Sequence, residues 1–453
     1  MNRKFELLKI FTIIVFLALL PSTTYAIQPT EGTLRIGLTS YRRDTKQITV
    51  IASSDFLITK TGTSDKLASS TNLTHITLEA GESEIILKRD NGASASVGTS
   101  VTVIPADPNA TITLDSPSRS MQYRGTIEVS IKSGTLRLVN IVRMEDYLFG
   151  VTPAEMPATF PQEAVKAQTI AARTYARNAT RRHSADGYDL CDGEHCQVYG
   201  GTLKERAKST KAVLATNGMV LTYNGQLIDA MYSADCGGIT QSFAESYCVD
   251  EVPYLCVVAE PTDIQHTCWE KTSTLLELAD KLTKAGIVEA TGLRSIKAVK
   301  TSSSGRVTSI EIAGEKAIKI ISGAKIRSLL GLKSILFTVE CSEDGIVLIK
   351  GKGYGHGIGM CQMGAKALAE PPYNYTYDQI LGHYYPGTKI TQGSGSVSTS
   401  TTVTDVENLN TSRVIYSQTV KVDSIPSIPE KKKPTKHNNV GVKFDVRVKA
   451  PHL

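Results

Sequence analysis

A single glutamate lies in a short segment whose composition suits acid–base chemistry. Glu155 stands between Pro153 and Pro157 in a run that is otherwise mostly apolar. Apolar surroundings penalise the charged form of a carboxyl group and raise its pKa, so such a glutamate holds a proton near neutral pH. A general acid that protonates a glycosidic oxygen needs this property. The competing interpretation is that Glu155 caps the helix predicted after Pro161, where an acidic side chain accepts hydrogen bonds from backbone N–H groups.

A second group of reactive side chains combines two cysteines with histidine. Cys191, His195 and Cys196 lie close together in the chain, and His183 is the nearest further imidazole. Thiolates and imidazole nitrogens in one tight turn suit a tetrahedral zinc ion. The alternative is a disulfide between Cys191 and Cys196, which an oxidising compartment favours. Four protein ligands would leave zinc no open position for water, so we expect a structural role for the metal and no cofactor in the chemistry of Glu155.

Residues 351–360 form a glycine-rich loop, GKGYGHGIGM. The loop lacks the Lys-Ser/Thr ending of a phosphate-binding P-loop, and no strand–helix–strand context surrounds it as a dinucleotide fingerprint requires. We therefore do not expect a nucleotide there. His356 either satisfies backbone groups inside the turn or hydrogen-bonds a substrate or Glu155.

Helices and strands must position these groups, and the sequence predicts both. Small apolar residues recur at helical spacing after Pro161, which predicts a helix over Gln162–Arg177. Short alternating apolar runs separated by Gly, Asp, Asn and Ser predict strands from 33 to 103. The fold class that follows is α+β, mostly β with a few helices. Further helices are expected at 203–215, 275–285 and 365–369, and further strands at 123–129 and 136–142.

The two ends of the chain differ in composition from its body. Residues 1–26 combine basic residues, an apolar run and a small-x-small ending at Ala26, the layout of a cleaved secretory signal peptide or an uncleaved signal anchor. We therefore expect an exported, extracytoplasmic protein, which would stay attached to the membrane if the segment is not cleaved. Residues 393–453 predict a flexible Ser/Thr-rich and basic tail. Between the ends we expect an N-terminal β-rich domain at 27–106 and a catalytic domain at 107–392.

The formal net charge of +6 comes mainly from the basic residues at the two ends, so the body of the chain is close to neutral. This distribution predicts no nucleic-acid-binding surface.

The cysteines outside the Cys/His group predict disulfide bonds. All eight cysteines lie between Cys191 and Cys361, and an even number in an exported chain is typical of disulfide pairing. Cys361 is either a free thiol or a partner of Cys341. The sequence does not determine the connectivity of the best candidates, which are Cys236, Cys248, Cys256 and Cys268.

A long motif runs through Glu155 and the helix predicted after it. It includes Glu145-Asp146-Tyr147-Leu148, Glu155-Met156-Pro157, Lys166-Ala167-Gln168 and Ala171-Ala172-Arg173-Thr174-Tyr175-Ala176. The motif resembles the signature of the SpoIID/LytB domain family. The likeness continues through 189–201, 233–240, 253–255 and 353–365, and it covers roughly residues 120–390.

The resemblance implies a peptidoglycan lytic transglycosylase that cleaves the MurNAc–GlcNAc β-1,4 bond with formation of 1,6-anhydro-MurNAc. Glu155 matches the family's catalytic glutamate. Its carboxyl group would protonate the leaving oxygen and then accept a proton from the MurNAc C6 hydroxyl. The resemblance also implies glycan strands stripped of stem peptides as substrate, and a cell-wall amidase and other engulfment proteins as partners.

The resemblance assigns further residues to the site. Arg173 is expected to bind substrate or position Glu155, or else to form a surface salt bridge on its helix. Thr240 and Tyr254 match groove-lining positions, with a plain strand or turn role as the alternative, and the glycines around His356 would let the backbone approach a sugar. Some relatives hold zinc with two cysteines and two histidines, which implies Cys191, Cys196, His195 and His183 as ligands.

Three functions remain open from the sequence. The first is a lytic transglycosylase that uses Glu155. The second is a non-catalytic, peptidoglycan-binding enhancer of a cell-wall amidase, the role of the LytB branch, and the third is a zinc hydrolase built on the Cys/His group. Retention of the Glu155 motif favours the first.

Overall fold

The computed structural model describes residues 32–41, 45–70, 75–180, 182–287 and 292–393. The predicted signal peptide and all but the first residue of the predicted tail lie outside these described residues. The chain divides into two compact units, Met1–Arg143 and Met144–Leu453. Strands outnumber helices in the described residues, which confirms the mostly β, α+β fold class. Within the same residues no helix is both long and apolar enough to cross a membrane.

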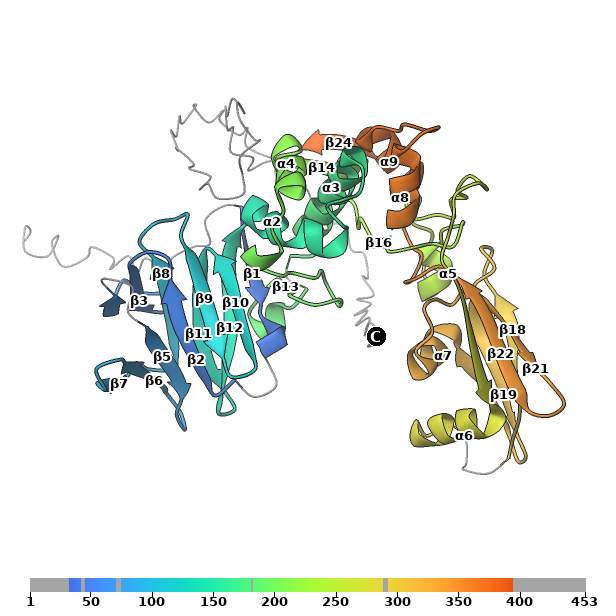
Figure 1. Cartoon of the computed structure of the whole chain (residues 1–453), viewed down its shortest axis with the longest axis horizontal. Coiled ribbons are helices and arrows are strands. Elements are labelled where there is room, and N and C mark those ends of the chain that lie inside the picture. Colours follow the sequence, from blue (N-terminus) through green and yellow to red (C-terminus); the bar gives the residue numbers. More distant parts are fainter. Residues whose placement is uncertain (1–31, 42–44, 71–74, 181, 288–291, 394–453) are drawn as a thin grey trace, which may run out of the picture. The chain divides into compact units, whose positions relative to one another are not determined.

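The first unit consists of two antiparallel sheets (Figure 1). In one sheet the strands of this unit follow the order β1-β12-β11-β8-β3-β4, and in the other they follow the order β10-β9-β2-β5-β6-β7. The elements are β1 (Thr33–Gly37), η1 (Thr39–Tyr41), β2 (Gln47–Ala52), β3 (Phe56–Lys60), β4 (Lys66–Ser70), β5 (Ile76–Ala80), β6 (Ile85–Arg89), β7 (Ser94–Ser96), β8 (Ser100–Pro105), β9 (Thr111–Ser116), β10 (Arg119–Arg124), β11 (Thr126–Lys132) and β12 (Thr135–Arg143).

Alternating side chains explain why these strands form layers. Val101 and Val103 on β8 are buried, as are Ile48 and Val50 on β2, whereas the residues between them are more exposed. Such alternation places one face of each sheet on a shared core. The two sheets touch where β12 contacts β5.

The boundary between the units differs from the one predicted at residues 106 and 107. β8 pairs with β11, and β2 pairs with β9, so strands from both sides of the predicted boundary share the same sheets. The proline-punctuated break at residues 105–108 therefore connects two strands of one unit. The unit ends at Arg143, where β12 runs directly into a helix.

The second unit carries most of the helices. Its elements are α2 (Met144–Glu155), α3 (Gln162–Asn178), η2 (Ser184–Asp186), β13 (Leu190–Cys191), η3 (Thr202–Lys204), α4 (Ala207–Ala215), β14 (Met219–Tyr223), β15 (Gln226–Leu227), β16 (Tyr232–Ser233), α5 (Phe243–Tyr247), β17 (Cys268–Thr274), α6 (Leu275–Lys284), β18 (Leu293–Thr301), β19 (Val307–Gly314), β20 (Ile318–Ser322), α7 (Gly323–Leu330), β21 (Phe337–Cys341), β22 (Ile346–Lys352), β23 (Met360–Cys361), α8 (Gln362–Ala369), α9 (Tyr377–Tyr384) and β24 (Lys389–Gln392). The predicted helices correspond to α3, to η3 with α4, to α6 and to α8.

Helix α3 lies at the centre of the main core of this unit. It contacts α2, α4, α8, α9 and β14. Ala164, Ala167 and Ala171 are fully buried on α3, and their small side chains let the neighbouring elements approach closely. The helical periodicity that predicts α3 therefore arises because these small apolar residues lie on its packed face.

Helix α2 was not predicted from the sequence. All residues from Asp146 to Thr152 are buried, so the segment shows no polar face and no helical periodicity. Gly150 and Pro153 also lie inside it, and both residues are poor helix formers. Packing overrides these local preferences. The consequence is that Glu155 is the last residue of a helix and not part of an isolated turn.

Residues 268–352 form a region with its own core. The sheets β17-β22-β21 and β18-β19-β20 carry α6 against β18 and α7 against β19 (Figure 1). Buried residues of this core include Leu282, Ile310 and Val347. Just after the end of this region, Tyr354 forms an isolated antiparallel bridge with Asp235.

Candidate active site

Glu155 is half-buried at the end of α2 and is held by two hydrogen bonds. The backbone N–H of Val198 donates to its Oε1 over 2.7 Å, and the Tyr232 hydroxyl also hydrogen-bonds its carboxyl group. Burial raises the pKa of Glu155 from 4.5 to about 7, although both hydrogen bonds lower it. The partial negative charge at a helix C-terminus also disfavours the carboxylate. Both protonation states are therefore accessible near neutral pH.

Glu155 does not cap the helix that follows it. The N-cap of α3 is Pro161, and no side chain hydrogen-bonds the N-terminus of α3 from that position. Glu155 belongs to the preceding helix, and its carboxyl group bonds Val198 and Tyr232 instead. The helix-capping interpretation is therefore wrong.

A buried hydrogen-bond network supports the Tyr232 hydroxyl. The Gln197 side chain donates from Nε2 to the Tyr232 hydroxyl over 3.0 Å and to the Ala172 carbonyl over 3.1 Å. The Tyr147 hydroxyl donates to Oε1 of Gln197 over 3.1 Å. These bonds fix the orientation of the Gln197 amide, which in turn fixes the hydroxyl beside Glu155. Sequence reasoning did not single out Tyr147, Gln197 or Tyr232, although each lies in or beside a segment of the long motif.

The four predicted zinc ligands lie together. One ligand atom each of His183, Cys191, His195 and Cys196 lies within 4.8 Å of all the others. Nε2 of His183 lies 3.3 Å from the sulfur of Cys196, and Nδ1 of His195 lies 3.5 Å from that sulfur and 3.7 Å from the sulfur of Cys191. The hydrogen bond with Cys196 lowers the pKa of Cys191 to about 5. Both cysteines are free thiols, and the donor set fits tetrahedral zinc.

The Cys/His group and Glu155 share one loop. Val198, whose N–H bonds Glu155, follows Cys196 by two positions. Glu194 lies in the same loop, is exposed, and its negative charge adds a smaller upward contribution to the pKa of Glu155. Any ligand that fixes this loop therefore acts on the geometry of the acid.

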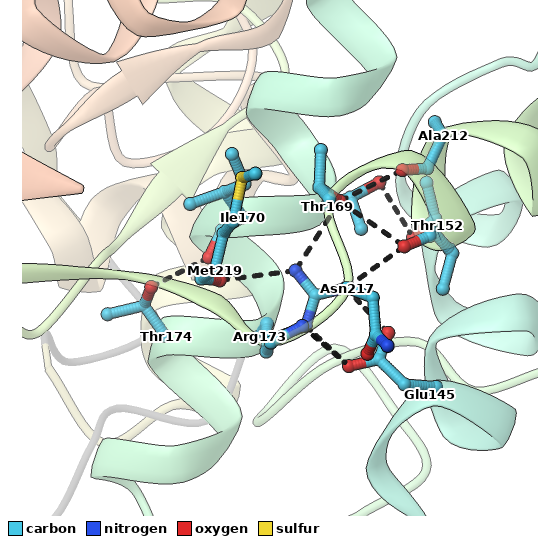
Figure 2. Close-up of polar contacts among 12 residues, drawn as sticks. Glu145, Thr152, Thr169, Ile170, Arg173, Thr174, Ala212, Asn217 and Met219 are labelled. Atoms are coloured by element: carbon cyan, nitrogen blue, oxygen red, sulfur yellow. Dashed lines mark hydrogen bonds and ion pairs between the residues drawn. The ribbon is translucent and has the colours of Figure 1, made fainter. Parts of the chain in front are cut away.

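Arg173 has a structural role in place of the predicted substrate-binding one (Figure 2). Its guanidinium is 1% exposed and pairs with the Glu145 carboxylate through Nε over 2.8 Å and Nη2 over 2.6 Å. Nη1 donates to the Met219 carbonyl over 3.2 Å. The pair joins α2, α3 and β14 inside the fold, so it is not a surface salt bridge either. A bidentate pair of this kind is strong because both partners are charged and planar.

Thr240 is also buried and has a structural role. Its hydroxyl donates to the Cys256 carbonyl over 3.2 Å and accepts the N–H of Val258 over 2.7 Å. These bonds join two loops. Because the side chain is buried, these contacts support the alternative of a plain strand or turn role for Thr240 over the predicted groove-lining role.

Tyr254 is half-buried against the main core. Its hydroxyl accepts the N–H of Asp229 over 3.5 Å, and its ring centroid lies 5.5 Å from that of Tyr223. Burial raises the pKa of its hydroxyl. These contacts give Tyr254 a packing role. Its side chain is also partly exposed, so the groove-lining role stays a prediction.

His356 satisfies backbone groups in the glycine-rich loop. Its Nδ1 accepts the N–H of Ile358 over 3.0 Å, and its ring also bonds the backbone of Tyr232. Burial, assisted by the charge of Arg327, lowers the pKa of His356 to about 4, so the ring is neutral. The turn interpretation of His356 is the one its contacts support. Its link to Glu155 is indirect and passes through Tyr232.

The cysteines predicted to form disulfides are free. None of Cys236, Cys248, Cys256 and Cys268 is paired, and Cys341 and Cys361 are free as well. Cys248, Cys268 and Cys341 are exposed, whereas Cys236 and Cys361 are buried. Their regular sequence intervals therefore do not correspond to disulfide pairing in the fold.

Two family models match the chain. Residues 132–223 match a family described as stage II sporulation protein, and residues 254–359 match a domain of unknown function. The first match covers Glu155, the α3 helix and the Cys/His group. The second covers the region with its own core.

The chain is also similar to curated proteins. It is 33% identical over 322 residues to stage II sporulation protein D of Bacillus subtilis (strain 168), a match that covers 67% of this chain and 88% of that protein. It is 35% identical over 275 residues to an uncharacterized protein of Brachyspira hyodysenteriae, covering 60% and 72%. It is 33% identical over 293 residues to an amidase enhancer of Bacillus subtilis (strain 168), covering 54% of this chain and 40% of the enhancer.

Proposed function

This chain belongs to the stage II sporulation protein D family, and from that membership we propose that it is a peptidoglycan lytic transglycosylase with Glu155 as its catalytic acid and base. Relatives named for sporulation and for amidase enhancement support a cell-wall-related role. They also support a place in the cell envelope or outside the cytoplasm. The proposed substrate is the MurNAc–GlcNAc β-1,4 bond of glycan strands.

The observation that carries the proposal is the protonation equilibrium of Glu155. Its pKa of about 7 supplies a neutral carboxyl group that donates a proton to the glycosidic oxygen as the C1–O bond breaks. The resulting carboxylate accepts the proton of the MurNAc C6 hydroxyl as O6 bonds to C1. The products are a free hydroxyl on the leaving sugar and a 1,6-anhydro ring, and Glu155 returns to its starting form.

Hydrogen bonds from the protein keep Glu155 suited to both steps. Val198 N–H and the Tyr232 hydroxyl stabilise the carboxylate that forms after the first proton transfer. Burial opposes them and keeps the neutral acid accessible. A glycosidase that uses water needs a second carboxylate beside the bond. Glu194 is the carboxylate whose charge raises the pKa of Glu155. Substitution of Glu194 therefore tests whether a second carboxylate takes part, as hydrolysis by water would require.

We propose that zinc at His183, Cys191, His195 and Cys196 supports the site structurally. Four soft protein ligands complete a tetrahedral shell and leave no position for a reacting water, which disfavours the zinc-hydrolase function. When bound, the ion would supply cross-linking of the loop that carries Val198. The chemistry would rest with Glu155.

A second candidate function is that of a non-catalytic enhancer of a cell-wall amidase. The specific observation in its favour is the 33% identity to the amidase enhancer. In that function the surface around Glu155 would bind glycan without cleaving it, and an amidase would be the partner.

Digestion of purified glycan strands separates these functions. Strands with and without stem peptides are treated with the wild-type protein, Glu155→Gln and Glu194→Gln, and the new termini are identified by mass spectrometry. Transglycosylation predicts anhydro-MurNAc ends that disappear in Glu155→Gln and persist in Glu194→Gln. Reducing ends without anhydro sugar that require Glu194 would indicate hydrolysis. Binding by the wild type without any cleavage would favour the enhancer.

A further inference from the structure

A second cluster of potential metal ligands lies near the points where the chain enters and leaves residues 268–352, the region with its own core. One ligand atom each of Cys236, Glu260, His266 and Cys361 lies within 4.8 Å of all the others. Both cysteines are 0% exposed, Glu260 is 6% exposed, and the His266 side chain is 9% exposed. The four residues are spread over more than a hundred positions of the chain. Their convergence in a buried site is therefore a property of the fold.

Two of the four ligand atoms have no hydrogen-bond partner. Oε2 of Glu260 and Nε2 of His266 are buried and form an ion pair of 3.0 Å, but neither atom makes a hydrogen bond of good geometry. Buried polar atoms that lack a well-formed hydrogen bond are rare in native proteins and call for an explanation such as a bound ion. A cation between the two side chains would satisfy both atoms.

The outer atoms of the same side chains are firmly held. Nδ1 of His266 lies 2.7 Å from Oδ1 of Asp235, whose carboxylate also accepts the N–H groups of Thr267 over 2.7 Å and Gly237 over 2.8 Å. The Tyr384 hydroxyl donates to Oε1 of Glu260. A histidine backed by a carboxylate in this way presents its other nitrogen to a metal in a fixed orientation.

Backbone N–H groups and a buried guanidinium lie around the two sulfurs. Cys361 is the N-cap of α8, and its sulfur accepts the N–H groups of Gly364 and Cys236, each over 3.2 Å. Helix N-termini favour negative charge on a capping thiolate. The buried Arg306 guanidinium donates to the Cys236 carbonyl over 2.6 Å and places positive charge close to both sulfurs. This charge offsets part of the excess negative charge of two thiolates and a carboxylate around a divalent ion.

Gly364 leaves room for the carboxylate of the cluster. A Cβ atom at this position would lie 2.0 Å from Oε1 of Glu260 and 2.0 Å from the Tyr384 hydroxyl. Only glycine permits the close approach that brings Glu260 to Cys361 and His266.

We propose that Cys236, Glu260, His266 and Cys361 bind a divalent metal ion, with zinc as the metal that this donor set suits best. Two thiolates, one imidazole and one carboxylate oxygen form a closed tetrahedral shell. Binding displaces the thiol protons to solvent. The site is separate from the Cys/His group beside Glu155.

The location of the site indicates what the ion does. Glu260 and His266 lie before β17, where the chain enters the region with its own core, and Cys361 follows β22, where the chain leaves it. These points nearly coincide with the limits of the matched domain of unknown function, residues 254–359. The ion would therefore link both connecting segments to Cys236 in the main part of the unit. Its role would be to stabilise the structure, not to catalyse a reaction.

Metal analysis of the full chain tests the proposal. The protein is purified under reducing conditions, loaded with zinc and compared with two double variants, Cys191→Ala/Cys196→Ala and Cys236→Ala/Cys361→Ala. The proposal predicts two equivalents of zinc in the wild type and one in each double variant. Cys248→Ala/Cys341→Ala is the matched control and retains both. A wild type with one equivalent, lost entirely in Cys191→Ala/Cys196→Ala, would overturn the proposal.

Cobalt spectra and peptide mapping cover the remaining outcomes. In the Cys191→Ala/Cys196→Ala background, Co²⁺ is expected to give sulfur-to-cobalt charge-transfer and tetrahedral absorption bands that His266→Gln alters without unfolding the chain. Chelation in this background should increase hydrogen exchange at 260–268 and 353–361. A disulfide-linked peptide containing Cys236 and Cys361, recovered from the protein as exported by cells, would instead assign the pair to a covalent clamp and overturn the metal site.

Discussion

The backbone N–H of Val198 donates a hydrogen bond of 2.7 Å to Oε1 of Glu155. This bond joins the last residue of α2 to the loop that carries Cys191 and Cys196. It favours the carboxylate, whereas burial of Glu155 favours the neutral acid. The two effects together set the pKa near 7, and each is open to change by a single substitution.

The first prediction concerns the pH dependence of cleavage. The neutral form of Glu155 donates the proton, so the rate should fall as the pH rises through about 7. Initial rates of anhydro-MurNAc formation, measured on both sides of neutral pH, check this. A rate that stays constant well above pH 7 would contradict the assignment of Glu155 as the acid.

The second prediction concerns the stability of Glu155→Gln. The folded protein holds a proton on Glu155 up to a pH of about 7, whereas the unfolded chain releases it near 4.5, so wild-type stability falls as the pH rises between these values. The amide has no such penalty. We expect Glu155→Gln to be more stable than the wild type above pH 7, by at most about 3 kcal/mol, and inactive. Urea unfolding at acid and alkaline pH measures the difference.

The control for this stability effect is Glu270→Gln, which changes an exposed glutamate. It should leave the free energy of unfolding nearly unchanged at both pH values. A loss of stability in Glu155→Gln at alkaline pH would show that the carboxylate is stabilised in the fold and would contradict the raised pKa.

The third prediction separates positioning from bulk packing at Tyr232. The Tyr232 hydroxyl lowers the pKa of Glu155, so Tyr232→Phe should raise this pKa and move the alkaline fall in activity to higher pH. The matched control is Tyr223→Phe, which removes a hydroxyl from a ring that packs against Tyr254. A lower rate with an unchanged pH profile in Tyr232→Phe would assign the hydroxyl to substrate contact or to packing alone.

The fourth prediction tests the structural role of Arg173. Arg173→Met leaves the Glu145 carboxylate without its bidentate partner inside the fold and should lower the free energy of unfolding by about 3–5 kcal/mol. Lys166→Met breaks the more exposed pair with Glu163 and should cost less than about 1 kcal/mol. The Michaelis constant of the folded Arg173→Met fraction should be unchanged. A large rise in that constant without loss of stability would restore the substrate-binding role.

Local chemistry in the sequence predicted part of the site. Composition indicated that Glu155 could be an acid or a helix cap, and the resemblance to the SpoIID/LytB family favoured the acid. The spacing of Cys191, His195 and Cys196 predicted a metal site, with His183 as the nearest further imidazole. The raised pKa of Glu155 follows from its apolar neighbours. The role of Arg173 could not be read in the same way, because helical spacing does not show that Glu145 meets it inside the fold.

Long-range pairing explains what the sequence did not show. The strands before and after residue 106 share sheets through registers that no local pattern encodes. Cys236 was predicted to form a disulfide, and Cys361 was predicted to be a free thiol or a partner of Cys341. Neither was predicted as a metal ligand, because their proximity to Glu260 and His266 depends on contacts between distant segments. Tyr232 was overlooked for the same reason, since only the fold brings it to Glu155.

The fifth prediction connects the Cys/His group to the acid. Cys196→Ser should weaken metal binding and loosen the loop that presents the Val198 N–H to Glu155. Because this hydrogen bond lowers the pKa of Glu155, its loss should raise that pKa and shift the alkaline fall in activity to higher pH, with a lower maximal rate. Cys248→Ser changes an exposed cysteine outside the group and should alter neither metal content nor the pH profile. If Cys196→Ser loses its metal but retains the wild-type rate and pH profile, the loop holds Val198 in place without the ion, and the proposed structural support of Glu155 by zinc is wrong.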